Sequence, residues 1–146
     1  MQLTLYTDYS LRVLIYLGLR RDRLSTVSEI AQSYGISRNH LVKVVHNLST
    51  LGFIVSTRGK GGGLSLARAP EQINIGDVVR NTEQNFNIVE CFDGKNRNCP
   101  ITAVCRLKGV LGDAANAFLR VLDGHTLADV LKNEQRLSVV LKVVRR

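Results

Sequence analysis

The three cysteines of the chain, Cys91, Cys99 and Cys105, lie in one short segment, and the chain contains no others. Cysteine thiolates are the usual protein ligands of soft metal ions and of iron–sulfur clusters. Three cysteines are too many for one disulfide and one too few for an all-cysteine metal site. The segment therefore predicts a soft-metal centre completed by one weaker, exchangeable ligand.

The spacing of the cysteines narrows the kind of centre. Seven residues separate Cys91 from Cys99 and five separate Cys99 from Cys105. The close CxxC pairs of structural zinc sites and thiol oxidoreductases are missing. An iron–sulfur cluster accepts more varied spacing, because its corners lie further apart than the ligands of a single ion. The spacing favours such a cluster; a zinc site, a thiol switch or no cofactor at all are the alternatives.

A [4Fe-4S] cluster held by three cysteines needs a fourth ligand, and a [2Fe-2S] cluster is the second form considered. The candidates are side chains that bear an imidazole or a carboxylate, and the spacing does not choose among them. A hard carboxylate on a soft centre is displaced more easily than a thiolate, as suits a sensor. By chemistry the candidates are Asp8, Glu90, Asp93, His40, His46 and His125.

Composition predicts one compact unit of 146 residues with a polyanionic partner. The chain has 20 Lys and Arg against 12 Asp and Glu, a formal net charge of +8, and 45% hydrophobic residues. A strongly basic balance favours nucleic acid. The N-terminus does not read as a signal peptide, and no apolar run is long enough to span a membrane. We expect a cytoplasmic protein whose thiols stay reduced and able to bind metal.

Two successive helices predict a helix-turn-helix. A first apolar helix is expected after Thr7, which has the chemistry of an N-cap, and Asp8 lies in its first turn. A short helix at 27–34 then begins after Ser25 or Thr26 and ends at Gly35. The next helix begins after Ser37 and carries an apolar stripe, with Gly52 at its end; the stripe consists of Leu41, Val44, Val45, Leu48 and Leu51. Helix, glycine turn and helix form the motif that DNA-binding proteins use.

The segment after the second helix predicts a wing. Strands at 53–57 and 64–67 flank the basic glycine turn 58–63. Glycines let the backbone approach a phosphate chain, and Walker or GxGxxG spacing is absent. The second helix of the helix-turn-helix also carries polar residues away from its apolar stripe, for which an ordinary solvent-exposed helix face is the alternative to DNA contact. The residues expected to contact DNA are Ser37, Arg38, Asn39, His40, Lys43, Arg58 and Lys60.

The helix after Cys105 has a longer apolar stripe than one domain of this size needs. Pairing with the same helix of a second subunit is the natural use, and a core helix within one chain is the alternative. The stripe consists of Leu107, Val110, Leu111, Ala114, Ala117, Phe118, Val121 and Leu122. A short helix is also expected from Ile75, ending before Asn81, and another from Thr126.

These elements predict a mainly α fold, in which a winged helix-turn-helix domain is followed by a long dimerisation helix. We divide the chain into a DNA-binding domain at 1–80, a cluster-binding loop at 81–106, and the dimerisation helix with a C-terminal segment at 107–146. No catalytic motif emerges, so the chain is not expected to be an enzyme. An electron carrier would leave the helix-turn-helix and wing without purpose.

Several segments also resemble the small winged-helix iron–sulfur regulators of transcription. The resemblance covers nearly the whole chain, and its combination of motifs is specific. It rests on Leu3-Thr4, Asp8-Tyr9-Ser10-Leu11-Arg12, Ser37-Arg38-Asn39-His40-Leu41-Val42-Lys43-Val44, Arg58-Gly59-Lys60-Gly61-Gly62-Gly63, Ile75-Gly76-Asp77-Val78-Val79-Arg80, the three cysteines and Cys105-Arg106-Leu107-Lys108.

Within that family, Phe86-Asn87-Ile88-Val89-Glu90-Cys91-Phe92-Asp93 is similar to the nitric-oxide-sensitive repressors. The resemblance implies a homodimer on a palindromic operator in double-stranded DNA, which releases DNA when nitric oxide attacks the cluster. It also implies Asp8 of the partner subunit as fourth ligand, with Arg12 one turn later near enough to pair with it. The cluster-assembly (IscR) branch, the alternative, uses a histidine near the cysteines, and the loop has none.

Overall fold

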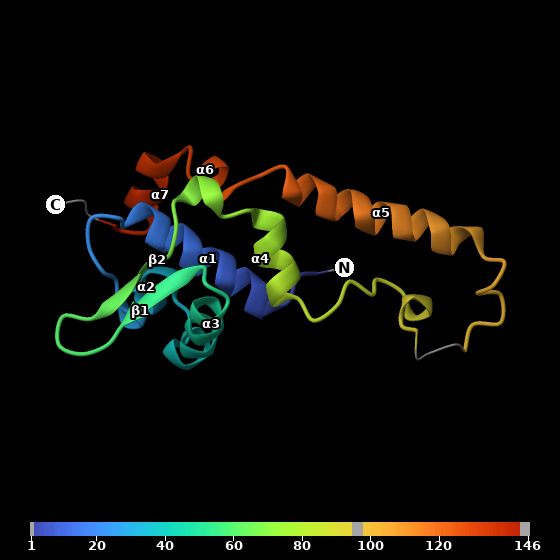
Figure 1. Cartoon of the computed structure of the whole chain (residues 1–146), viewed down its shortest axis with the longest axis horizontal. Helices are drawn as coiled ribbons and strands as arrows, with labels where there is room; N and C mark the ends of the chain where they lie inside the picture. The colour runs from blue at the N-terminus through green and yellow to red at the C-terminus, as the bar shows by residue number, and fades with distance from the viewer. Residues whose placement is uncertain (1, 95–97, 144–146) are drawn as a thin grey trace.

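The computed structural model describes residues 2–94 and 98–143 of the chain. Its helices are α1 (Leu5–Leu19), α2 (Val27–Tyr34), α3 (Arg38–Thr50), α4 (Ile75–Thr82), α5 (Arg106–Asp123), α6 (Leu127–Val130) and α7 (Glu134–Val140), with strands β1 (Ile54–Thr57) and β2 (Gly63–Leu66) and the 3₁₀ turns η1 (Pro70–Gln72) and η2 (Glu90–Phe92). In Figure 1, α5 reaches away from a body formed by the other helices and the hairpin, and the cysteine segment begins beside the outer half of α5 and joins it at its far end. The predicted fold class, mainly α with a winged helix-turn-helix, is confirmed.

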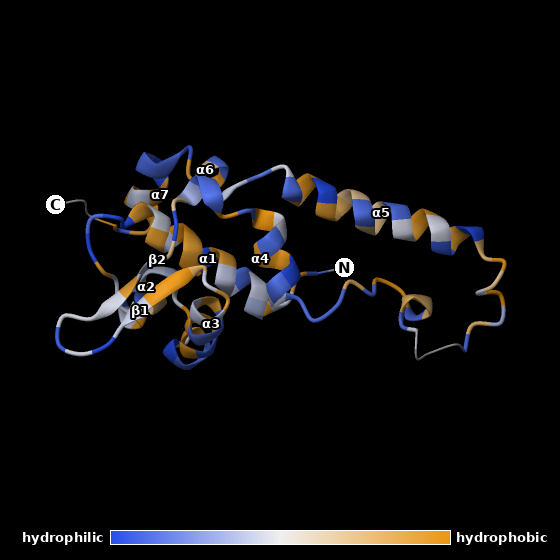
Figure 2. Cartoon of the chain, in the orientation of Figure 1, coloured by the Kyte–Doolittle hydropathy of each residue, from blue (hydrophilic) through white to orange (hydrophobic). Residues whose placement is uncertain are grey.

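Helix α1 is the centre of the core. It packs against α3, α4, α6, α7 and β2, and it is coloured as largely hydrophobic in Figure 2. Gly18 allows Leu131 to pack directly against α1, because a Cβ at position 18 would lie 2.5 Å from Leu131 Cδ1. The helices after α5 therefore fold back onto the body. Leu127 of α6 and the residues that follow α6 and α7, Leu131 and Leu141, contribute side chains to the core.

The first turn of α1 differs from the prediction. The N-cap is Thr4, whose hydroxyl accepts a hydrogen bond from the Thr7 backbone N–H at 3.3 Å, so the choice of Thr7 was wrong. Glu83, just beyond α4, accepts hydrogen bonds from the Thr4 backbone N–H at 2.7 Å and from the Thr4 hydroxyl at 3.1 Å. This contact with a residue 79 positions away fixes where α1 begins.

The two helices of the predicted helix-turn-helix are present. Thr26 and Glu29 form a reciprocal capping box at the start of α2, which satisfies two backbone donors. Gly35 ends α2 with φ of 64°, a left-handed conformation that glycine adopts without strain. Helix α3 buries four of the five predicted stripe residues, Leu41, Val44, Val45 and Leu48, and its other face is open to solvent.

The predicted wing is an antiparallel hairpin in which Ile54 pairs with Leu66 and Thr57 with Gly63. Gly59 and Gly61 have φ of 96° and 81°, so the turn between the strands needs residues without a Cβ. Backbone hydrogen bonds between Ser25 and Leu64, in both directions, attach the hairpin to the segment before α2. The wing is thereby held beside the helix-turn-helix.

A polar joint connects α4 to the end of α5. Arg80 forms a bidentate ion pair with Asp123, and the Asn74 amide donates to the Asp123 carbonyl at 2.7 Å. Gly76 lies beneath this pair, and a Cβ there would overlap Asp123 Oδ1. Helix α4 continues through Asn81 to Thr82, so the expected end before Asn81 was wrong; the Thr82 hydroxyl bonds the Val78 carbonyl at 2.8 Å within the last turn.

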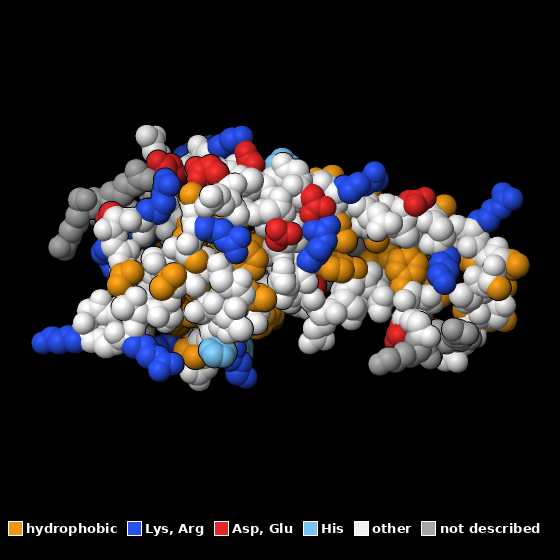
Figure 3. All heavy atoms as spheres, viewed as in Figure 1, with side chains coloured by type: hydrophobic (Ala, Val, Ile, Leu, Met, Phe, Trp, Pro, Cys, Tyr) orange, Lys and Arg blue, Asp and Glu red, His pale blue; other side chains and the backbone are white. Residues whose placement is uncertain are grey.

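None of the residues of α5 is buried in this chain. Leu107, Val110 and Val121 are 61–63% exposed, and Figure 3 shows hydrophobic side chains along the side of α5 that faces the cysteine segment. Within the chain, α5 is therefore not a core helix, which was the alternative to pairing. No helix in the described ranges is long and apolar enough to cross a membrane.

Candidate DNA-binding surface and cysteine site

The exposed face of α3 carries the side chains expected to contact DNA. Asn39 and Lys43 are exposed on the side away from the buried stripe. Ser37 occupies the N-cap position, but its hydroxyl makes no capping hydrogen bond and so remains able to bond elsewhere. In a helix-turn-helix the N-terminal residues of the second helix are those that reach base edges. The arrangement suits contact with a major groove.

Contacts with α1 and α2 orient this face of α3. Arg38 donates from Nε to the Ser28 hydroxyl at 3.2 Å. The His40 ring stacks on the Tyr9 ring, with centroids 6.4 Å apart and planes inclined by 27°. These two side chains are therefore partly engaged within the chain, and we expect Asn39 and Lys43 to be freer to meet DNA.

The wing adds positive charge beside α3. Arg58 and Lys60 are exposed in the turn between β1 and β2. Figure 3 shows Lys, Arg and His side chains along the lower edge of the molecule, over α3 and the hairpin, and no acidic side chain is visible there. A surface of one sign attracts the phosphate backbone at long range.

The sequence contains a signal for this surface that motif reasoning missed. Residues 30–70 include five Lys and Arg and no Asp or Glu, although the chain has 12 acidic residues in all. The run covers α3 and the whole wing. One of its arginines, Arg68, has a structural use: it donates to the Gly52 carbonyl at 3.2 Å and lies over the Phe53 ring.

The three cysteines are free and half-buried. Cys91 lies in η2, Cys99 begins a turn in which the Thr102 hydroxyl bonds the Cys99 carbonyl at 2.8 Å, and Cys105 is the N-cap of α5. Among the described residues, which exclude 95–97 of this segment, no group of three or more His, Cys, Asp or Glu side chains is gathered as a metal site. The donors suit iron by chemistry, while a loaded site would need the segment to close around it.

Asp8 lies far from the cysteines of its own chain. In Figure 1 the start of α1 is at the body, whereas η2 lies beside the outer half of α5 and the turn before Cys105 lies at its far end. The carboxylate pairs with Arg12 at 2.8 Å, as expected, and both side chains are more than a third exposed. Asp8 is thus accessible, and nothing else in the described chain holds it by an ion pair.

Arg12 connects Asp8 to the helix-turn-helix. Its guanidinium lies 5.9 Å from the centre of the Tyr9 ring and 5.7 Å from that of Tyr34. Tyr34 ends α2, and burial raises its pKa to about 12, so it stays neutral. Because Tyr9 also stacks on His40, contacts run without a break from Asp8 to α3.

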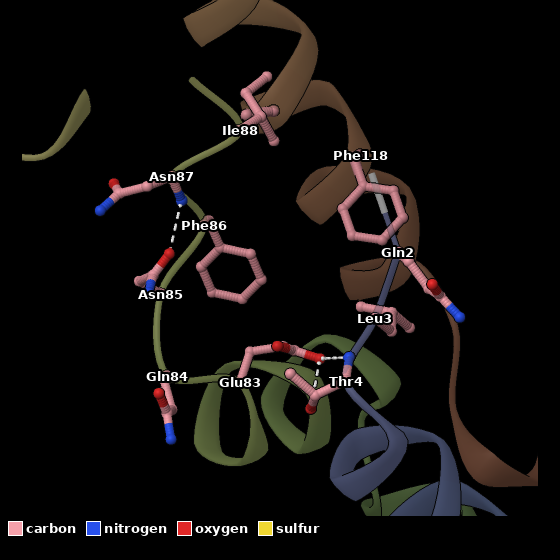
Figure 4. Close-up of a pocket in the computed structure, with 11 residues that line it drawn as sticks. Gln2, Leu3, Thr4, Glu83, Gln84, Asn85, Phe86, Asn87, Ile88 and Phe118 are labelled. Atoms are coloured by element: carbon pink, nitrogen blue, oxygen red, sulfur yellow. Dashed lines mark hydrogen bonds between the residues drawn. The ribbon is translucent and has the colours of Figure 1, made fainter. Parts of the chain in front are cut away.

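An open pocket of about 470 Å³ lies between the N-terminus, the 83–88 segment and α5. Figure 4 shows the Phe86 and Phe118 rings facing into it, with Leu3 and Ile88 beside them and the Thr4–Glu83 hydrogen bonds at its base. Its largest side chains are apolar, and it adjoins the exposed helix α5. The pocket and the exposed side chains of α5 therefore form one continuous apolar surface.

The sequence model of the Rrf2 family, described as "Iron-dependent Transcriptional regulator", matches residues 3–133. The chain belongs to the Rrf2 family. Its similarity to two members named HTH-type transcriptional regulator NsrR is high: 54% identity to that of Halalkalibacterium halodurans and 53% to that of Bacillus subtilis, each over 98% of this chain and 99% of the relative. The family resemblance and the expectation that the chain is not an enzyme are confirmed.

Solved structures of the Rrf2 fold are also similar. T. potens IscR has a TM-score of 0.73 and 26% identity, covering 91% of this chain and 88% of that one. CymR, described as the global cysteine regulator of B. subtilis, has a TM-score of 0.72 and 25% identity, covering 89% and 95%. A protein described as a cysteine regulator thus shares the fold of a chain whose family is described as iron-dependent, so the signal must be argued from the site.

Proposed function

We propose that the chain is a homodimeric repressor that senses nitric oxide through an iron–sulfur cluster and releases its operator when the cluster reacts or is lost. The observation that carries the proposal is the set of three free cysteines in the segment that leads into an exposed helix of an Rrf2 protein. High identity to relatives named NsrR supports placing the chain in the nitric-oxide-sensing branch of the family. We assign the protein to the cytoplasm, where these thiols would stay reduced.

Cys91, Cys99 and Cys105 would hold the cluster, which we take to be [4Fe-4S]. When bound, it supplies iron centres with which nitric oxide can react. The thiolates of the chain supply the strong soft ligands, and half-burial limits the access of water to them. A loop histidine, the ligand of the IscR branch, is absent between Cys91 and Cys105.

Helix α5 would pair with its copy in the second subunit. The exposed residues Leu107, Val110 and Val121 share one seam with Ala114 and Ala117, because the five recur at intervals of three and four. That spacing is typical of two helices packed along a seam, and small residues allow close crossing. Closure around a two-fold axis would also cover the pocket beside Phe118.

Asp8 of the partner subunit would complete the iron site. The separation of Asp8 from the cysteines of its own chain supports a ligand that crosses the dimer. Its present partner, Arg12, is held by an exposed ion pair, and such pairs are worth only about 0–1 kcal/mol. Exchange of Arg12 for iron therefore costs little.

Arg12 would transmit the change to α3. A guanidinium released by Asp8 interacts differently with the Tyr9 and Tyr34 rings, and Tyr9 is stacked on His40. The two recognition helices of a dimer must lie about 34 Å apart to enter successive major grooves. A coupling of about 1–3 kcal/mol between the cluster site and this spacing would change DNA affinity about 5–150-fold.

The test is a spectrum and a gel shift on the same anaerobic preparation. We expect brown protein with iron and sulfide, binding to an operator selected from random duplexes, and loss of that binding on titration with nitric oxide. Colourless protein that still binds DNA specifically would favour the zinc or thiol-switch alternative. Coloured protein whose DNA binding ignores nitric oxide would contradict the sensing step and leave the IscR-type role.

Contacts from the wing can be tested with Lys60→Ala. We expect weaker binding to every duplex and a slope of log K against log salt that is smaller by about 0.9, because one phosphate contact is lost. The control is Lys132→Ala, because Lys132 is an exposed lysine that follows α6 and pairs with Asp129.

The reading of bases by α3 can be tested with Asn39→Ala, which should relax discrimination at a single base pair, at a cost of about 1–3 kcal/mol. Unchanged titrations in both would place the DNA surface elsewhere.

A further inference from the structure

Helix α3 exposes one large apolar side chain, Val42. Within the described chain, its exposed fraction is 42%, whereas the other valines and leucines of α3 are 7% exposed or less. It is not among the side chains packed against the core. Single exposed apolar residues are common and need no explanation by themselves, so the position of Val42 on the helix must carry the argument.

Val42 lies among the residues of the proposed DNA-reading face. It follows Asn39 by three residues and Arg38 by four, and it precedes His46 by four. Residues at these separations are neighbours on a helix surface. Each of those three neighbours is exposed and polar, so the valine forms an apolar point on a face that otherwise hydrogen-bonds.

We propose that Val42 reads the 5-methyl group of a thymine in the operator. The inference rests on the proposed DNA-binding role of α3. The thymine methyl is the apolar mark of an A·T pair in the major groove, and small apolar side chains are the groups that contact it. A β-branched residue suits this task, because one χ1 rotamer dominates in a helix and little freedom is lost on binding.

Uracil substitution tests this contact without changing the protein. Each thymine of the selected operator is replaced in turn by deoxyuridine, which keeps all hydrogen-bonding groups and lacks only the methyl. We expect one position in each half-site to weaken binding about fourfold, the effect of one buried methyl group. That position should lose its sensitivity in Val42→Ala, which is compatible with the helix.

Val130→Ala is the matched control, because Val130 is 38% exposed on α6 and lies outside the helix-turn-helix and the wing. Its uracil profile should equal that of the wild type. A wild-type profile without a sensitive thymine, or one that persists unchanged in Val42→Ala, would overturn the inference while DNA binding itself stands. Failure to bind any selected duplex would instead overturn the proposed function.

Discussion

Each of Cys91→Ala, Cys99→Ala and Cys105→Ala should give colourless protein after anaerobic purification. Removing one thiolate leaves a four-iron cluster with two strong ligands, and the chain has no spare cysteine to replace it. We also expect affinity for the operator to fall about 5–150-fold, to the level of wild type treated with nitric oxide. Iron and sulfide content, the visible spectrum and a gel shift measure these losses.

Val104→Ala is the control for the cysteine variants. Val104 lies next to Cys105, is 81% exposed and bears no ligand atom, so its removal should leave colour and DNA binding intact. Iron and sulfide at the wild-type level in any one cysteine variant would remove that cysteine from the site. Loss of colour with unchanged DNA binding would separate the cluster from repression.

Local signals made much of the fold predictable. Thr26 and Glu29, or Gly35 at positive φ, act within one turn of the chain, so their effect can be read from neighbouring residues. The start of α1 was misplaced for the opposite reason. Thr7 has a side chain suited to an N-cap. The helix nevertheless begins at Leu5, because Thr4 is held by a hydrogen bond to Glu83, the residue that follows α4.

The candidate site was predictable in chemistry and less so in geometry. The cysteines can be recognised by residue type alone, whereas the structure spreads them over a turn, a 3₁₀ helix and the N-cap position of α5. The sequence gives no physical reason for a glycine at position 76. The structure gives one, because Gly76 lies under the Arg80–Asp123 ion pair and a Cβ there would overlap it. The proposed fourth ligand depends on a second chain, and periodicity within one sequence carries no record of that contact.

The origin of the fourth ligand can be tested by pairing two defective chains. Asp8→Ala and Cys91→Ala chains carrying different tags are co-expressed, and the mixed dimer is isolated by successive use of both tags. Recovery of that species itself requires the dimer that the α5 seam predicts. In the mixed dimer, the Asp8→Ala chain keeps all three cysteines and its partner keeps Asp8. If the carboxylate comes from the partner, one iron site is therefore complete and the other lacks both Cys91 and Asp8.

If Asp8 crosses the dimer, the mixed species should hold about half the iron of the wild type, since one of two symmetric sites is complete. That iron should show the wild-type spectrum and wild-type stopped-flow rate with nitric oxide. The Asp8→Ala homodimer should instead hold a labile cluster with a changed spectrum, because a ligand is missing. Asp22→Ala is the matched control, because Asp22 is an exposed acid beyond the other end of α1.

Two results would contradict this assignment. A mixed dimer that behaves like the Asp8→Ala homodimer would mean that Asp8 acts within its own chain. An Asp8→Ala homodimer identical to the wild type would exclude Asp8 and leave Glu90 and Asp93 as the next carboxylates to replace.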